Sequence, residues 1–75
     1  DDEALLSSRE KDIVICIAKG MSSKEIADHL FISVNTVNTH RRNISSKLQI
    51  HSPSGLAIYA IVNGLVTIDQ LKPVD

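Results

Sequence analysis

Hydrophobic residues recur at helical spacing along the first part of the chain. Positions 13, 14, 17, 18 and 21 are apolar and follow the period of a helix that should span about 8–19. Ser7 and Glu10 have the spacing of a capping box at its start, and Gly20 suits its end. The run IVICIA would also suit a buried strand, because β-branched side chains favour extended backbone. The caps and the length of the segment favour the helix.

The next segment predicts a short helix that ends near Leu30. Ser22 and Glu25 repeat the capping-box spacing at its start. Its inward stripe consists of Ile26, Ala27 and Leu30. Residues 31 and 32, both apolar, then form a turn before the next helix.

Residues 33–48 predict a third helix, with Ser33 as its cap. At 100° per residue, one narrow arc should pack inward, with the stem of Arg41 and Val34 at its margin; it contains Val37, Ile44 and Leu48. The opposite arc is polar and holds Asn35, Asn38, Thr39, Arg42, Asn43 and Ser46. No acidic residue lies between Asp28 and Asp69. The polar arc therefore offers donors, acceptors and a guanidinium without a carboxylate that would repel phosphates.

A fourth, unusually apolar helix follows. Ser52 and Pro53 start it, and Gly64 closes it after Asn63. One inward stripe consists of Leu56, Ala57 and Ala60. A second stripe, which we expect a four-helix domain to leave uncovered, consists of Ile58, Ile61 and Val62. An exposed apolar stripe beside Tyr59 is suited to a self-complementary two-fold interface.

The second and third helices, joined by a three-residue turn, match a helix-turn-helix, with small Ala27 at their crossing and Val37 opposite. In that motif the second helix enters the DNA major groove. Arg can match guanine O6 and N7, Asn can match adenine N6 and N7, and a Thr methyl can meet a thymine methyl. A polar helical face can also be merely solvated, but the tandem favours DNA reading. We predict an all-α, four-helix helix-turn-helix domain with the third helix for recognition.

The chain resembles the LuxR/GerE/FixJ-type DNA-binding domain, the C-terminal output module of many bacterial transcription regulators. The resemblance covers roughly residues 5–66. It rests on LSSRE (6–10), KG (19–20), SKEIA (23–27), the L-x-I-S of 30–33, TV (36–37), His40 and KL (47–48). Together these elements are highly specific, although each alone is weak.

The resemblance implies a role for each part of the third helix. The usual base-facing positions correspond to Asn38, Thr39 and Arg42, which also lie on the polar arc. The implied contacts to the DNA backbone are Ser23, Lys24, Ser33, Asn35, Thr36 and Lys47. Lys24 lies near a helix N-terminus, which attracts anions, and Lys47 can reach a phosphate from the far end of the third helix.

The fourth helix forms the dimer contact in the resembling family. We therefore expect a homodimer interface at Ser54, Ile58, Ile61 and Val62. Such a dimer would place two recognition helices about one DNA turn apart, on an inverted repeat with half-sites ~10 bp apart.

The chain departs from the family pattern at two positions. Asn38 stands where many relatives carry a charged residue, and Ser8 where proline is frequent. A neutral amide at position 38 removes a Coulombic contact, so we expect affinity to depend more on Arg42 and on dimerisation.

The net charge of −1 is contrary evidence for a nucleic-acid binder. Its distribution weakens the objection, because seven acidic residues lie in the first 28, whereas positions 29–68 carry Arg41, Arg42, Lys47 and three histidines. The field at one face matters more than the sum.

The remaining composition excludes several classes of protein. Cys16 cannot form an internal disulfide and is expected to be an ordinary buried thiol. No apolar run approaches the ~20 residues of a membrane span, so we expect a cytoplasmic fragment without membrane contact. His29, His40 and His51 stand eleven apart, which does not suit a metal site; His40 is expected instead to orient a backbone contact. We predict no enzyme, no cofactor and no small-molecule ligand in this domain.

These observations divide the chain into an acidic tail or linker remnant at 1–5, the DNA-binding domain at 6–66 and a C-terminal tail at 67–75. The leading hypothesis is a sequence-specific, dimeric binder of double-stranded DNA, gated by an absent N-terminal domain. RNA polymerase is a candidate partner. One alternative is the promoter-reading region of a sigma factor. Another is a protein-interaction module that uses the apolar fourth helix and binds no nucleic acid.

Overall fold

The computed structural model describes residues 6–71. Its elements are α1 (Ser8–Ala18), α2 (Ser23–Leu30), α3 (Val34–Leu48), α4 (Pro53–Val62) and a short 3-10 helix, η2 (Ile68–Gln70). These 66 residues contain helices and no strand, which confirms the predicted all-α fold. The predicted acidic tail, residues 1–5, and residues 72–75 of the predicted C-terminal tail, 67–75, lie outside the described residues.

Serine side chains start all four α-helices, as predicted. Each cap accepts a hydrogen bond from the backbone N–H three residues later; the caps are Ser7, Ser22, Ser33 and Ser52. In α1 and α2 a glutamate also accepts the N–H of the cap itself, at 2.9 Å for Glu10 and 2.8 Å for Glu25. The first turns of α3 and α4 contain no acidic residue. The amino ends of α1 and α2 are therefore closed by carboxylates, whereas that of α3 is not.

Two helices end in a left-handed residue that is not glycine. Phe31 closes α2 with φ 60°, and Gln49 closes α3 with φ 56°. The sequence predicted an apolar turn at residues 31 and 32, but only Ile32 packs against the core. Phe31 is 93% exposed. The left-handed cap thus carries the ring of Phe31 outward into solvent.

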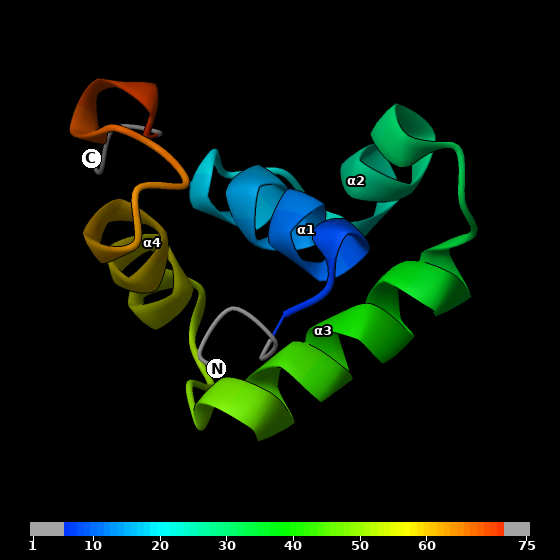
Figure 1. Ribbon diagram of the computed structural model, residues 1–75. Helices are drawn as coiled ribbons and strands as arrows, with labels where there is room; N and C mark the ends of the chain where they lie inside the picture. Colours follow the sequence, from blue (N-terminus) through cyan, green and yellow to red (C-terminus); the bar gives the residue numbers. More distant parts are fainter. Residues whose placement is uncertain (1–5, 72–75) are drawn as a thin grey trace.

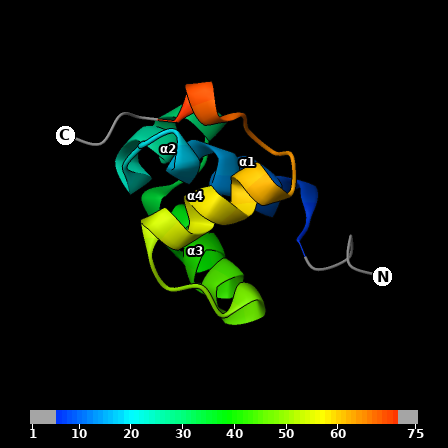
Figure 2. The same ribbon diagram turned by 90° about the vertical axis from the view of Figure 1, so that its left-hand side faces the viewer.

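Helix α1 lies at the centre of the domain, with α4 packed against it and α3 crossing both α1 and α2 (Figure 1). Figure 2, turned by 90°, shows α4 lying across α1 on the face away from α2. The buried apolar residues come from every α-helix and include Ile13, Val14, Ile26, Val37, Ile44 and Ala60. Cys16 is a free thiol in this core, and burial raises its pKa. The core thus fixes α2 and α3 on one side of α1.

The chain folds back after α4 in a way that the sequence did not predict. Gly64, with φ 73°, reverses the chain, and the N–H of Leu65 donates to the carbonyl of Ala60 at 2.8 Å. Val66 is then 4% exposed, and Leu71 packs partly against the core. Residues 67–71, the described part of the predicted C-terminal tail, thus contain the short helix η2.

Candidate nucleic-acid interface

Helices α2 and α3 form the predicted helix-turn-helix. Phe31 and Ile32 both donate backbone hydrogen bonds to the carbonyl of Ala27, which closes the turn between the helices. Ala27 is 4% exposed and Val37 is fully buried, as expected of the residues at the crossing. The crossing holds α3 with one side against the core and the other toward solvent.

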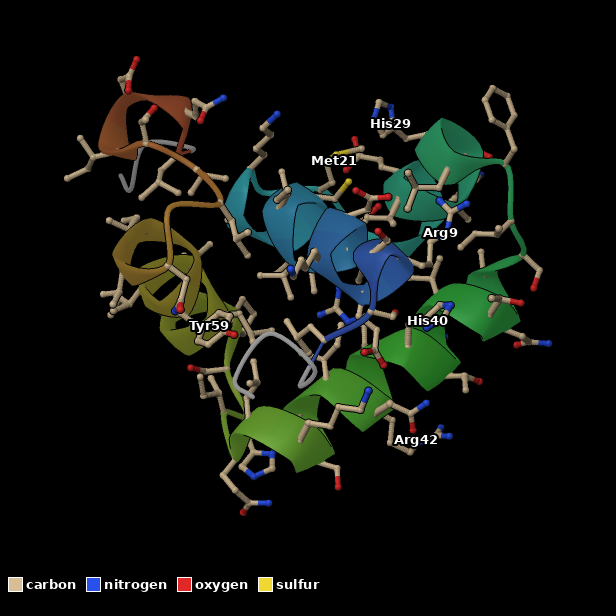
Figure 3. All side chains as sticks on the ribbon, viewed as in Figure 1. Arg9, Met21, His29, His40, Arg42 and Tyr59 are labelled. Atoms are coloured by element: carbon tan, nitrogen blue, oxygen red, sulfur yellow. The ribbon has the colours of Figure 1, made fainter. Side chains whose placement is uncertain are left out.

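The polar side of α3 is exposed along its length. All six predicted residues are exposed: Asn35, Asn38, Thr39, Arg42, Asn43 and Ser46. Val37 and Ile44 are buried, Leu48 is half-buried, and Val34 is 41% exposed at the margin, so the predicted orientation of the helix is confirmed. Figure 3 shows Arg42 on the side of α3 turned away from α1. We call these six exposed residues the polar face.

Two of the three predicted base-reading side chains are held by hydrogen bonds. The hydroxyl of Thr39 donates to the carbonyl of Asn35 at 3.0 Å, which leaves its methyl group and oxygen lone pairs for a ligand. Oδ1 of Asn38 accepts a hydrogen bond from the hydroxyl of Ser23 at 3.0 Å. Within residues 6–71, no carboxylate pairs with Arg42. Its guanidinium donors are therefore available to a partner.

The amino end of α3 brings together three predicted backbone-contact residues. Ser33 caps the N–H of Thr36 at 3.0 Å, and the two hydroxyls share a hydrogen bond of 2.9 Å. One hydroxyl proton of the pair remains free, as do first-turn N–H groups such as that of Asn35. Without an acidic side chain in this turn, an anion can approach these donors.

The first turn of α2 supplies two more predicted contacts. Lys24 is exposed there. Ser23 is half-buried, and its hydroxyl proton is used by Asn38, which leaves its backbone N–H and lone pairs. The structure thus brings Ser23 and Asn38 together, a contact that sequence reasoning missed.

Lys47 lies at the opposite end of α3 and is not a free cation. Its Nζ lies 2.7 Å from Oε1 of Glu10, whose side chain is 6% exposed, while that of Lys47 is 41% exposed. Burial alone would raise the pKa of Glu10. Hydrogen bonds from Lys47 and from the N–H of Ser7, with the positive charge of Lys47 and His40, outweigh burial and hold this pKa below its ordinary value.

The spacing of α3 contained a signal for this pair. Lys47 follows the buried Ile44 by three residues, so its stem lies near the inward side and its amine can reach the start of α1. Glu10 was assigned only to the capping box. The Glu10 carboxylate both caps α1 and pairs with Lys47.

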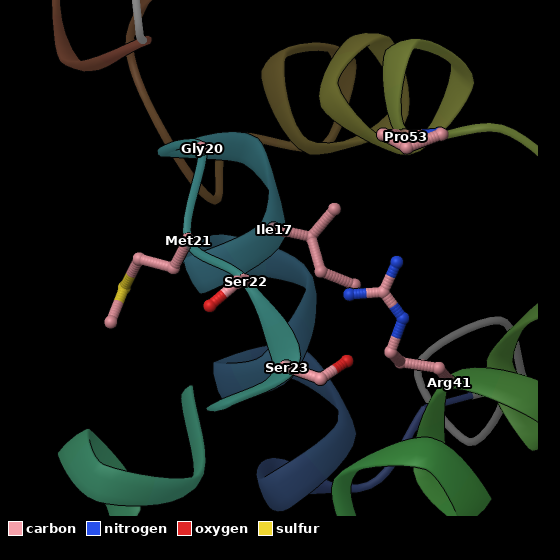
Figure 4. Close-up of a pocket in the computed structure, with 7 residues that line it drawn as sticks. All are labelled: Ile17, Gly20, Met21, Ser22, Ser23, Arg41 and Pro53. Carbon is pink, nitrogen blue, oxygen red and sulfur yellow. The ribbon is translucent and has the colours of Figure 1, made fainter. Parts of the chain in front are cut away.

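Arg41 was placed at the inward margin of α3, and its side chain is half-buried as that position requires. Figure 4 shows its guanidinium extending toward Ile17 and Pro53. It lines a pocket of about 330 Å³ between the start of α2 and the start of α4, with Gly20, Met21, Ser22 and Ser23. A positive charge therefore lies beside the amino end of α2.

His40 lies on the α1 side of α3 (Figure 3). Its Nδ1 is buried and has no hydrogen-bond partner among the described residues. The backbone contact predicted for His40 is therefore not made through Nδ1. In the same part of the chain, no group of three metal-ligating residues is present, and no helix has both the length and the apolar character needed to cross a membrane.

The second apolar stripe of α4 is only partly uncovered. Ile58 is 62% exposed and Val62 is 77% exposed, and Ser54 is also exposed. The expectation that the whole stripe is uncovered was wrong for Ile61, which is half-buried and packs against the domain's own core. The reason is its position one turn after Ala57 and beside Ala60, which gives it the edge of the inward stripe. The free part of the stripe is therefore Ile58 and Val62.

Comparisons with known proteins agree with this geometry. The profile of the family described as "Bacterial regulatory proteins, luxR family" matches residues 4–60. The chain is 46% identical over 61 residues to the transcriptional regulatory protein LiaR of Bacillus subtilis, covering 81% of this chain and 29% of LiaR. It is 44% identical over 66 residues to the oxygen regulatory protein NreC of Staphylococcus carnosus, covering 88% of this chain and 30% of NreC.

A third relative is the transcriptional regulatory protein MctR of Rhizobium johnstonii, 45% identical over 62 residues, which are 83% of this chain and 29% of MctR. The chain thus spans less than a third of the length of these curated relatives. The family match covers both helices of the motif and most of α4. The matched part is a helix-turn-helix domain of the kind that binds DNA in transcription regulation, and it is not an enzyme. The chain belongs to the LuxR family of bacterial regulatory proteins.

Proposed function

We propose that this domain binds double-stranded DNA in a sequence-dependent manner, with α3 in the major groove. The single observation that carries the proposal is the polar face, which is exposed along α3 and free of carboxylates. A helix of this kind fits the major groove, where amide, hydroxyl and guanidinium groups can distinguish base edges. In this proposal Asn38, Thr39 and Arg42 read bases.

The proposed phosphate contacts lie on both sides of these base readers. Ser33, Asn35 and Thr36 offer donors at the amino end of α3, where no acidic residue repels a phosphate. Ser23 and Lys24 add donors from the first turn of α2. Lys47 is the sixth proposed contact, and it would reach a phosphate while remaining close to Glu10. This distribution supports a duplex whose backbone runs past both ends of the motif.

The proposal extends to a homodimer formed through α4. Ile58 and Val62 are the exposed apolar residues on this helix, next to the exposed Ser54. A two-fold contact there would bury them and set two copies of α3 on an inverted repeat, with half-sites ~10 bp apart. The half-buried Ile61 would then contribute only its uncovered edge.

Regulation by another part of a longer protein completes the proposal. LiaR and NreC are regulatory proteins of more than three times the matched length, which leaves room for a domain that receives a signal. We propose that such a domain gates DNA binding. Contact with RNA polymerase belongs to the same proposal, since a regulator bound beside a promoter acts through that enzyme. Chromosomal DNA as the ligand implies action in the cytoplasm.

The test is binding to duplex DNA at a series of salt concentrations, first with random-sequence duplex and then with sequences selected from a random pool. The logarithm of affinity should fall linearly with the logarithm of salt, with a slope of about −0.9 for each phosphate that a lysine or arginine neutralises. Selected sequences should bind more tightly than random ones at every salt concentration. Affinity that does not respond to salt would reject DNA binding and favour a protein-interaction module.

A further inference from the structure

The hydrogen bond between Ser23 and Asn38 ties the first turn of α2 to the middle of the polar face. Ser23 Oγ and Asn38 Oδ1 are 3.0 Å apart, and the two residues are fifteen positions apart in the sequence. Asn38 is exposed, so nothing else in the described part of the domain restrains its amide by burial. The bond therefore determines which end of the amide faces α2.

The surroundings of Ser23 favour the oxygen end of the amide. A rotation by half a turn would exchange Oδ1 and Nδ2, and a serine hydroxyl can either donate or accept. Ser23, however, is the first residue of α2, where unpaired N–H groups and the helix dipole create a partial positive charge. The side chain of Arg41 lines the same pocket as Ser23 and adds a full positive charge (Figure 4). The Glu25 carboxylate in this turn accepts the N–H of Ser22 and offsets part of the dipole's charge, but the guanidinium of Arg41 still favours the carbonyl oxygen over the amino group.

We infer that Ser23 is a positioning residue that makes Asn38 read DNA as a hydrogen-bond donor. The inference rests on the proposed function, and it specifies the chemistry of one base position. With Oδ1 directed to Ser23, the amino group Nδ2 is the end available to the duplex. In the major groove guanine offers two acceptors, O6 and N7, thymine offers O4, adenine offers N7, and cytosine offers only the N4 donor.

The base that faces Asn38 is therefore one with an acceptor, with guanine favoured and cytosine disfavoured. Adenine loses the two-bond match that a free asparagine makes, because that match needs the amide oxygen directed toward adenine N6. The preference for guanine over cytosine depends on both residues, because without Ser23 the side chain of Asn38 can turn its oxygen outward and accept a hydrogen bond from cytosine N4. Ser23 thus influences specificity without contacting a base.

The experiment measures base preference by selecting binding sites from random duplexes with the 75-residue chain and its variants. Asn38→Ala identifies the position, because the preference should disappear at that base pair alone. Kd values for duplexes with guanine or cytosine at this position then give a ratio for each protein. For the unmodified chain we expect the Kd of the cytosine duplex to be about tenfold higher than that of the guanine duplex. Ser23→Ala should reduce this ratio about three- to fivefold, which is the effect of one hydrogen bond.

Three further variants separate positioning from phosphate contact. Ser23→Thr keeps the hydroxyl and should keep the ratio. Ser8→Ala is the matched control, because Ser8 also follows a capping serine as the first residue of its helix, but in α1. It should leave the ratio unchanged. Asn38→Asp presents only acceptors, so its preference should turn toward cytosine. Circular dichroism should show the same helical content for all variants, since the caps Ser7, Ser22 and Ser33 are intact.

Two results would overturn the inference. In the first, Ser23→Ala weakens all sequences equally and leaves the ratio unchanged, as for a residue that contacts only phosphate. In the second, the unmodified chain prefers cytosine, or no base, at the position that Asn38→Ala identifies. Failure of the proposed function has a different signature, because the chain would then select no sequence at all and its affinity would not respond to salt.

Discussion

Lys47 Nζ donates to Oε1 of Glu10 at 2.7 Å, and the same oxygen accepts the N–H of Ser7 at 2.9 Å. One carboxylate thus caps the amino end of α1 and holds the carboxyl-terminal part of α3. Because Glu10 is 5% exposed, its charge has little access to water and depends on these two donors. The Lys47–Glu10 ion pair therefore helps to hold α3 in its orientation against α1.

Lys47→Met should lower the free energy of unfolding. The substitution keeps the apolar stem but leaves the Glu10 carboxylate buried without its cation. We expect a loss of about 1–2 kcal/mol, less than for a fully buried pair because Lys47 is partly exposed. Urea denaturation followed by circular dichroism measures it. Lys24→Met, at an exposed position, is the control, and an equal change in both variants would mean that the Glu10 pair contributes nothing.

The same pair predicts how stability depends on pH. The pKa of folded Glu10 lies below its ordinary value of 4.5, so the unfolded chain binds its proton more readily than the folded one. The stabilisation is complete above the ordinary pKa and is lost as the pH falls through the lowered pKa. Glu10→Gln keeps an oxygen for the N–H of Ser7 but cannot ionise. Its denaturation midpoint should therefore fall less steeply with acid, and parallel curves for the two proteins would contradict the assignment.

Arg42→Ala and Lys24→Ala should weaken DNA binding in different ways. Loss of the Arg42 guanidinium should cost about 1–3 kcal/mol on a selected site and blur the preference at one base pair. Loss of the Lys24 ammonium should weaken all sequences alike and reduce the salt slope by about one. Binding of each variant to selected and random duplexes over a salt series distinguishes the two. If the variants behave identically, the division into base readers and phosphate contacts is wrong.

Ile58→Asp should abolish the proposed dimer without unfolding the monomer. Ile58 is 62% exposed, so a carboxylate there meets solvent in the monomer but would be buried in a two-fold contact through α4. Ile68→Asp is the matched control, because Ile68 is 76% exposed but belongs to η2. Sedimentation equilibrium over a range of concentrations measures both. Dimers that persist in Ile58→Asp would exclude Ile58 from the contact.

Phe31→Gly should stabilise the domain. Phe31 adopts φ 60° and is 93% exposed, so it carries the strain of a left-handed residue and little packing. Glycine removes that strain, and after its own entropic cost in the unfolded chain we expect a gain of about 0.5–1 kcal/mol. Phe31→Ala removes the ring but keeps Cβ, so thermal unfolding should show no such gain. Stabilisation by alanine as well would assign the effect to the exposed ring.

The helices and their starts could be predicted because local chemistry determines them. A serine hydroxyl caps the N–H three residues later wherever a helix begins, and the apolar period identifies the buried side. The exposed polar arc of α3 followed from the same geometry. The end of α4 at Gly64 could also be predicted, but not the return of Val66 to the core, because that depends on how the helices pack around it.

Contacts between helices were the part that sequence reasoning missed. The partners of Lys47 and Asn38 lie 37 and 15 positions away; the spacing along α3 placed the stem of Lys47 near the inward side, but no local pattern identified either partner. The partial burial of Ile61 has the same cause, since the edge of an apolar stripe is covered or not according to how its neighbour crosses it. These contacts depend on the angles at which helices pack, which a one-dimensional period does not contain.

The polar face has a further consequence for α3 itself. Asparagine, threonine and serine are weak helix formers, because their short side chains compete for backbone hydrogen bonds. A helix whose outer side consists largely of these residues has a low helical content in isolation. In the domain it stays helical because Val37 and Ile44 are buried in the core. Loosening of the hydrophobic interior therefore distorts the polar face directly, so substitutions far from it can weaken the DNA binding that we propose for it.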